Sequence, residues 1–207
     1  MPRNKHYHRR SIRLKGYDYT QPGAYFVTIC THGREILFGQ VMDGEMVLNE
    51  YGQIVQACWR EIPAHFPHVA LEAFVVMPNH IHGIILIVDD IAEMTTPVGA
   101  THASPLQNTP RGPVRGSLGA IVGGFKSAAT RRINTLRNTP SAPVWQRNYY
   151  EHIVRNDRAL NAIRRYIAAN PVRWDVDRYN PHATGRDPWA AEIDHLLRIT
   201  PFPKETP

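Results

Sequence analysis

Two histidines separated by one residue, His80 and His82, are the clearest chemical feature of the sequence. They lie in MPNHIHGIILIV, where the apolar, β-branched surroundings are typical of a buried strand. Side chains two residues apart on a strand point to the same face, so both imidazoles project together and could share a metal ion. Burying them without partners would be costly. The pair alone is a weak signal, because histidines at this spacing are more often hydrogen-bonded core residues.

Three classes of enzyme use such a pair. Histidine-triad hydrolases need a third alternating histidine, and Ile84 at that position excludes them. Two-histidine phosphoesterases need a second His-x-Ser/Thr motif in a matching strand, and the other histidines of the sequence offer none. The remaining class combines one metal-binding pair with a nucleophile on a separate element.

A candidate nucleophile lies in DRALNAIRRYIAANPVRW, where Tyr166 and Asn170 are four residues apart and share one face of a predicted helix. Leu160, Ile163 and Ile167 form the apolar stripe of this helix, and Tyr166 with Asn170 follows its flank. The plain alternative is an interfacial tyrosine and an asparagine near a helix end. The residues alone favour that alternative.

Four blocks of sequence, in family order, resemble the single-tyrosine transposases of the His-hydrophobic-His class: VMPNHIHGIILI, SLGAIVGGFKSAATRRIN, VWQRNYYEHIVRND and IRRYIAANPVRW. The resemblance covers residues 10–180 and is strongest to the branch associated with repetitive extragenic palindromes. It implies that His80, His82 and Asn170 bind Mg²⁺ or Mn²⁺ and that Tyr166 is the nucleophile. It also implies a ferredoxin-like fold, similar to RNA-recognition modules, with the histidines on the central strand.

The predicted function is therefore cleavage and strand transfer of single-stranded DNA, at hairpin sequences, through a covalent phosphotyrosine. Two alternatives remain open. A non-catalytic single-stranded nucleic-acid-binding module would leave the histidines and tyrosine without a shared purpose. A metal-dependent hydrolase with water as nucleophile is disfavoured because no Asp or Glu ligand is near the motifs. The predicted ligands are all neutral, so we expect weak metal binding without DNA.

Positive charge is segregated along the chain, whose formal net charge is +6. The first fifteen residues contain six Arg or Lys and no acid, and residues 111–150 contain seven and no acid. Such segregation suits a phosphate backbone, and aromatic side chains can stack on unpaired bases. The predicted DNA-binding residues are Lys126, Arg131, Arg132, Arg164, Arg165, Trp145, Tyr149 and Tyr150. Core packing is the alternative for the three aromatic residues.

The elements that must position these residues alternate irregularly between strand and helix. This pattern predicts an α+β fold, with an antiparallel sheet covered by helices on one side. Two strands joined at Pro78–Asn79 predict a tight hairpin, and Asp43–Gly44 predicts another. The predicted elements are strands at 24–31, 69–77 and 80–88, and helices capped by Asn49, Ser117 and Asp157, the last running to Asn170.

The chain is expected to hold one transposase domain at 23–180, preceded by a basic arm at 1–22. A flexible insertion at 89–116 and a mostly irregular, Pro-rich extension at 181–207 are also expected. Without a signal peptide or a long apolar run, the sequence predicts a cytoplasmic protein with no membrane association, acting as a monomer or homodimer. Cys30 and Cys58 are predicted to be buried thiols.

Overall fold

The computed structural model describes residues 14, 16–88 and 113–199. Most of the predicted basic arm and insertion, and the end of the predicted extension, lie outside the described residues. The domain boundaries therefore stay predictions. Among the described residues, no helix combines the length and the hydrophobicity needed to cross a bilayer.

The core of the fold is a β-α-β-β-α-β unit with an antiparallel sheet in the order β4-β5-β1-β6. This is the predicted ferredoxin-like arrangement, with the histidine strand β5 at the centre of the sheet. In chain order the unit comprises β1 (Gly23–Cys30), α1 (Glu50–Arg60), β4 (Val69–Met77), β5 (His80–Ile87), α3 (Leu118–Leu136) and β6 (Tyr150–Val154).

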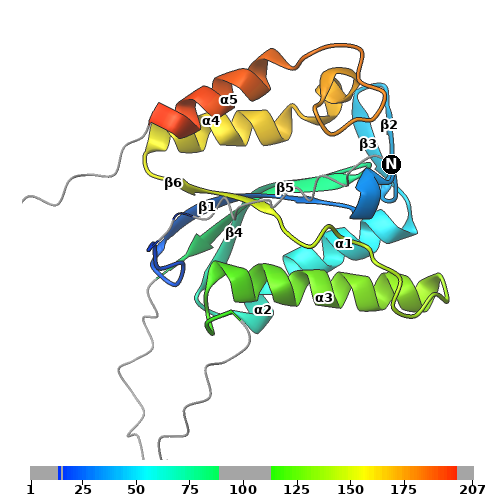
Figure 1. Ribbon diagram of the computed structural model, residues 1–207, viewed down its shortest axis with the longest axis horizontal. Helices are drawn as coiled ribbons and strands as arrows, with labels where there is room; N and C mark the ends of the chain where they lie inside the picture. Colours follow the sequence, from blue (N-terminus) through cyan, green and yellow to red (C-terminus); the bar gives the residue numbers. More distant parts are fainter. Residues whose placement is uncertain (1–13, 15, 89–112, 200–207) are drawn as a thin grey trace, which may run out of the picture.

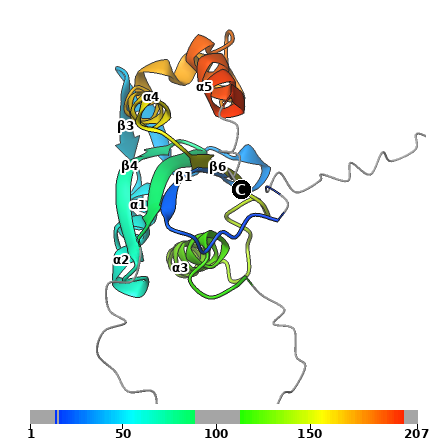
Figure 2. The same cartoon turned by 90° about the vertical axis from the view of Figure 1, so that its left-hand side faces the viewer.

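Helices cover both faces of the sheet, as Figures 1 and 2 show. The helices α1 and α3 lie on one face, in agreement with the prediction. On the opposite face lie α4 (Asp157–Ala168) and α5 (Pro188–Ile199). The prediction of helices on one side is therefore wrong for these two, because the apolar stripe of α4 also needs a surface on which to be buried.

The predicted turns and caps have simple local causes. Pro78 and Asn79 form the two-residue connection between β4 and β5, whose last and first residues pair in register. Asp43 and Gly44 both have positive φ, at 52° and 78°, as the turn between β2 (Gly39–Met42) and β3 (Glu45–Leu48) requires.

The helix caps differ from the prediction in one case. Asn49 and Ser117 accept hydrogen bonds from Gly52 and Ala120 as expected. Asn156, not Asp157, caps α4, because the Asn156 side chain accepts from the backbone N–H of Ala159. This helix ends at Ala168, and Asn170 is the N-cap residue of the following 3₁₀ turn η2 (Pro171–Val176).

Some elements were not expected from the sequence. The elements β6, η2 and α5 were not predicted. The last of these, α5, lies in the extension at 181–207, which was expected to be mostly irregular. Ala190 and Ile193 of α5 are buried in the same cluster as α4. Two short elements complete the fold, η1 (His32–Arg34) and α2 (Ile62–His65).

Alternation along β5 divides its side chains between the two faces. His80, His82 and Ile84 point toward α4, whereas Ile81 and Ile85 join the core formed with α1 and α3. Gly83 directly follows His82 and points to the opposite face, where a Cβ atom built there would be 2.3 Å from the Trp59 ring. The absence of a side chain at Gly83 thus lets Trp59 pack directly against the strand that carries the histidines.

Candidate metal and tyrosine site

The two histidines meet at their Nε2 atoms, which lie 3.1 Å apart. Both side chains are essentially inaccessible to solvent. Burial lowers the pKa of His82 to about 3, and burial, followed by the charge of His82, lowers the pKa of His80 well below its usual value. Both imidazoles are therefore neutral at physiological pH, the form that binds a metal.

Asn79 determines which nitrogen of His80 carries the proton. The Asn79 Nδ2 atom donates to the backbone carbonyls of Arg34 and Tyr179, at 3.1 and 2.7 Å. Its Oδ1 atom therefore faces His80 Nδ1, 2.9 Å away, and can only accept. The Nδ1 atom of His80 must be the donor, so its Nε2 atom presents a lone pair to the site.

On the other side of the pair, His82 Nδ1 lies 2.8 Å from the hydroxyl of Thr28 on β1. Thr28 can either donate or accept here. If His82 Nδ1 donates, two bare Nε2 atoms face each other, an arrangement that a shared cation would stabilise. The side chains of Asn79 and Thr28 thus form hydrogen bonds to the Nδ1 atoms of the two histidines and fix the orientation of the rings, as in many metal sites.

A buried carboxylate, Asp177, completes a group of three possible ligands. One ligand atom from each of His80, His82 and Asp177 lies within 4.8 Å of the others. Burial raises the pKa of Asp177 above its usual value, against hydrogen bonds from its neighbours, foremost the backbone N–H of Tyr179. The expectation of no nearby acid is therefore wrong, whereas the wholly neutral ligand set stays a prediction, with Asp177 as a further candidate ligand. Asp177 was not predicted as a candidate ligand because it lies in an irregular segment directly after η2, where no periodic pattern indicates its direction.

Asn170 lies beside two of these side chains, Asp177 and His80. Its Nδ2 atom donates to Asp177 Oδ2 at 3.3 Å, while its buried Oδ1 atom makes no hydrogen bond of acceptable geometry. The amide is close enough to His80 to act on the pKa of that imidazole. An oxygen that is buried, unsatisfied and close to the neutral His80 imidazole fits the ligand preference of a divalent cation.

Tyr166 approaches the pair from α4, one helical turn before Asn170. Its ring centroid lies 5.2 Å from that of His82 and 6.4 Å from that of Phe26. Burial, followed by the nearby Asp177, raises the pKa of the Tyr166 hydroxyl above its usual value. A neighbouring cation or base would therefore have to assist its ionisation. The role predicted for Tyr166 remains a prediction, but its position next to the histidines is the required one.

A second tyrosine that sequence reasoning missed, Tyr179, also lies over the histidines. Its ring centroid is 4.6 Å from that of His80 and 5.9 Å from that of His82, and the Arg34 guanidinium lies 5.5 Å from the same centroid. Only a small cavity of about 40 Å³ remains between Tyr179, Tyr166 and His82. Tyr179 therefore covers the histidines and competes with Tyr166 as the nearest phenol.

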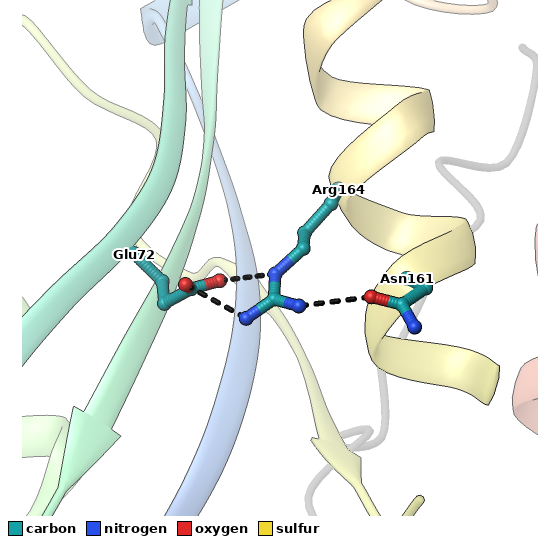
Figure 3. A network of polar contacts seen from close by, with 3 residues as sticks. All are labelled: Glu72, Asn161 and Arg164. Carbon is teal, nitrogen blue, oxygen red and sulfur yellow. Dashed lines mark hydrogen bonds and ion pairs between the residues drawn. The ribbon is translucent and has the colours of Figure 1, made fainter. Parts of the chain in front are cut away.

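The predicted DNA-binding cations differ in how they are engaged. Arg164 on α4 forms a bidentate ion pair with Glu72 of β4 and also donates a hydrogen bond to Asn161 (Figure 3). Arg132 forms a similar pair with Glu61. Lys126 donates to the carbonyls of Gln146 and Arg147. By contrast, the exposed Arg131 and Arg165 form no ion pair among the described residues.

The predicted aromatic contacts separate between the two faces of the sheet. Trp145 is 7% exposed and packs against Phe38 and Phe125, and Tyr149 lies at the edge of the same core. Tyr150 lies on the opposite face and lines the small cavity next to Tyr166 and His82. Of the three, only Tyr150 is near the histidines. His152 of β6 does not line that cavity.

Comparison with known proteins gives relatives in sequence and in structure. No family model matches the chain. It is 41% identical over 172 residues to an uncharacterised protein of Haemophilus influenzae, a match that spans 83% of this chain and 93% of the relative. It is 22% identical over 157 residues to another protein of that organism, named "Putative REP-associated tyrosine transposase", spanning 75% of this chain and 74% of the relative.

Among solved structures, a REP-associated tyrosine transposase bound to a REP hairpin matches with a TM-score of 0.50 and 18% identity. The match covers 78% of this chain and 74% of that protein. At this identity the likeness concerns the fold, and it agrees with the α+β architecture described above.

Proposed function

We propose that this chain, which belongs with the REP-associated branch of the single-tyrosine transposases, cleaves and rejoins single-stranded DNA through a covalent link to Tyr166. The observation that carries the proposal is the meeting of two elements. Tyr166 and Asn170 approach from α4 and the residues that follow it, and His80 and His82 project toward them from β5.

The side chains present fit a divalent cation such as Mg²⁺ or Mn²⁺. The Nε2 atoms of His80 and His82, a carboxylate oxygen of Asp177 and Oδ1 of Asn170 would hold it. When bound, the cation would polarise a phosphoryl oxygen and orient the phosphodiester. Asn79 keeps the proton of His80 on Nδ1, away from the cation.

In the proposed reaction, the Tyr166 hydroxyl oxygen forms a bond to phosphorus as the bond to the leaving 3′ oxygen breaks. The phenolic proton is lost and the leaving oxygen gains one, so no net proton is consumed. The phosphotyrosine link conserves the bond energy of the phosphodiester. A 3′ hydroxyl on another strand can therefore reverse the step without a nucleotide cofactor.

Hairpin-containing single strands are the proposed substrate. The support is the related structure, which is that of a protein bound to a REP hairpin. Action on DNA accords with a cytoplasmic location. A monomer or a homodimer could carry out this chemistry, since the two elements described above belong to one chain.

A second candidate function gains support from Asp177. A carboxylate beside two imidazoles is a ligand set that also suits a metal-dependent hydrolase using water. Such an enzyme would cleave DNA but form no adduct. The non-catalytic binding module would neither cleave DNA nor form an adduct.

The deciding experiment detects a covalent protein–DNA adduct on a denaturing gel, using Mn²⁺ and a labelled single strand that carries a hairpin. Wild type should form the adduct, and Tyr166→Phe should bind DNA but form none. The controls are Tyr179→Phe and Tyr150→Phe, which remove the two competing phenols and should leave the adduct in place. An adduct that survives in Tyr166→Phe and disappears in a control variant would reassign the nucleophile. Equal cleavage of a perfect duplex would contradict the hairpin preference.

A further inference from the structure

A groove of about 850 Å³ lies on the side of the sheet that faces away from the histidines. It runs between the C-terminal half of α3 and the loop at 138–147, and its lining contains three cationic side chains and no acid. The α3 residues Ser127, Thr130, Arg131, Asn134 and Thr135 form one wall. A concave, basic and hydroxyl-rich surface suits a polyanion.

Two arginines at this groove form no ion pair with the described residues. Arg131 and Arg147 are exposed, and neither has an acidic partner among the residues that the structure describes. The next residue along α3, Arg132, is outside the groove and is paired with Glu61 at 2.7 Å. The two exposed arginines of the groove are therefore not neutralised by a carboxylate of the described residues.

The loop that forms the other wall is held in place. Lys126 Nζ donates to the carbonyls of Gln146 and Arg147, at 2.6 and 3.1 Å. Asn134 and Arg137 donate to the carbonyl of Ala142. A groove whose wall is already ordered loses little conformational entropy when a ligand binds.

The groove also contains an unsatisfied donor. The indole N–H of Trp145 is buried without an acceptor among the described residues, and Trp145 lines the groove. Buried donors usually have a partner. Because this nitrogen is closed to solvent, a DNA oxygen could accept from it only if the ring or the loop at 138–147 moves.

The groove and the histidine site are joined by one short stretch of chain. Trp145 bridges to Thr31 at the end of β1, and Tyr150 pairs with Thr28 and lines the cavity next to Tyr166. Residues 145–150 therefore run along the edge of the sheet from the groove to the proposed nucleophile. A flexible strand could follow the same edge.

We propose that this groove binds the sugar-phosphate backbone of single-stranded DNA next to the segment held at Tyr166, through Arg131 and Arg147. The inference rests on the proposed function for the identity of the ligand. The DNA would pass around the β6 edge, so that one strand contacts both faces of the sheet.

The test measures binding of the full chain to labelled oligothymidine by fluorescence anisotropy at several salt concentrations, with a chelator present to prevent cleavage. The double variant Arg131→Ala, Arg147→Ala should bind about tenfold more weakly, and its salt slope should fall by about 1.4 if two phosphate contacts are lost. The control, Arg60→Ala with Arg158→Ala, removes the same charge from exposed positions outside the groove. It should change affinity by less than about twofold, with an unchanged slope.

Equal weakening by the groove variant and by the control would overturn the inference, because net charge alone would then explain binding. Adduct formation by the wild type is scored separately. If the adduct forms and the groove variant behaves like the control, the inference alone fails. If no adduct forms, the covalent mechanism fails, and a selective loss in the groove variant would still support a single-strand-binding groove.

Discussion

The two faces of the sheet are buried by different kinds of contact. Toward α1 and α3, Tyr25, Val27 and Ile29 of β1 are covered by apolar side chains such as Trp59. Toward α4, the same strand presents Phe26 and Thr28, which lie against the histidines of β5 and the phenol of Tyr166. One face therefore gains stability from packing, whereas the other buries polar groups whose hydrogen bonds hold them in fixed orientations.

The difference suggests how the fold carries a site that costs stability. Buried imidazoles, an amide and a carboxylate are expensive to remove from water, even when paired. The apolar face compensates for this cost, and Gly83 connects the two by letting Trp59 support the histidine strand from behind. Substitutions on the apolar face should act mainly on stability, and substitutions on the polar face mainly on metal binding and chemistry.

The largest effect on stability is expected from Gly83→Ala. Its Cβ atom would lie 2.3 Å from the Trp59 ring, which is itself stacked on Phe74, so the ring cannot move freely. We expect the free energy of unfolding to fall by about 3 kcal/mol, measured by denaturant unfolding. The matched control is Gly123→Ala in α3, where nothing lies within 4 Å. It should stabilise by about 0.5–1 kcal/mol, and equal effects of the two would contradict this packing argument.

The next effect concerns metal affinity on the polar face. Asp177→Asn removes the only acidic side chain in the group formed with His80 and His82 among the described residues. We expect the affinity of the free protein for Mn²⁺ to fall by about 10- to 100-fold, measured by calorimetric titration. Asp175→Asn, at an exposed position two residues earlier, makes the same charge change and should have little effect. Unchanged affinity in Asp177→Asn would exclude this carboxylate as a ligand.

A smaller effect should appear as acid sensitivity of the polar face. Burial lowers the pKa of His152, on the face of β6 that carries Tyr150, to about 4. Between pH 4 and 6.5 the unfolded chain then binds more protons at this residue than the folded chain does. The contribution of His152 to the free energy of unfolding is therefore fully present above pH 6.5 and declines as the pH falls toward 4.

Replacing His152 should therefore flatten the pH dependence of unfolding. Between pH 6.5 and 4, the free energy of unfolding should decrease by about 1–2 kcal/mol less in His152→Gln than in the wild type, after allowing for partial exposure to solvent. The control His65→Gln alters an exposed histidine of α2. An unchanged slope in His152→Gln would show that other groups cause the acid sensitivity.

The smallest effect is expected at the ion pair between Arg164 and Glu72, which joins α4 to β4 (Figure 3). The two side chains are 42% and 25% exposed, so Arg164→Ala should cost about 0–1 kcal/mol of stability, and less at high salt. Because Arg164 is already paired, its loss should also weaken DNA binding less than Arg165→Ala does. The reverse order in anisotropy titrations would mean that DNA displaces Glu72.

Local sequence patterns were sufficient to predict the direction of site residues that lie close together in the sequence. The spacing of His80 and His82 on an apolar strand was sufficient to predict that both point to one face. The spacing of Tyr166 and Asn170 likewise predicted a shared direction, which holds although α4 ends at Ala168, because the backbone keeps right-handed helical angles through Asn170. Pro78–Asn79 and Asp43–Gly44 predicted two hairpins, since short turns have strong residue preferences.

Only the tertiary structure decided which residues from separate elements meet. Asp177 and Tyr179 follow η2 in an irregular segment without periodicity, and folding brings both onto β5. The sequence identified Asn79 only as a turn residue. In the structure, its Nδ2 atom donates to two carbonyls distant in the sequence, which leaves its Oδ1 atom to accept a hydrogen bond from His80 Nδ1. Likewise, the sequence shows where Arg164 lies but not that Glu72 neutralises it. Periodicity reports the face of one element, whereas ligand sets, proton positions and ion pairs depend on how several elements pack.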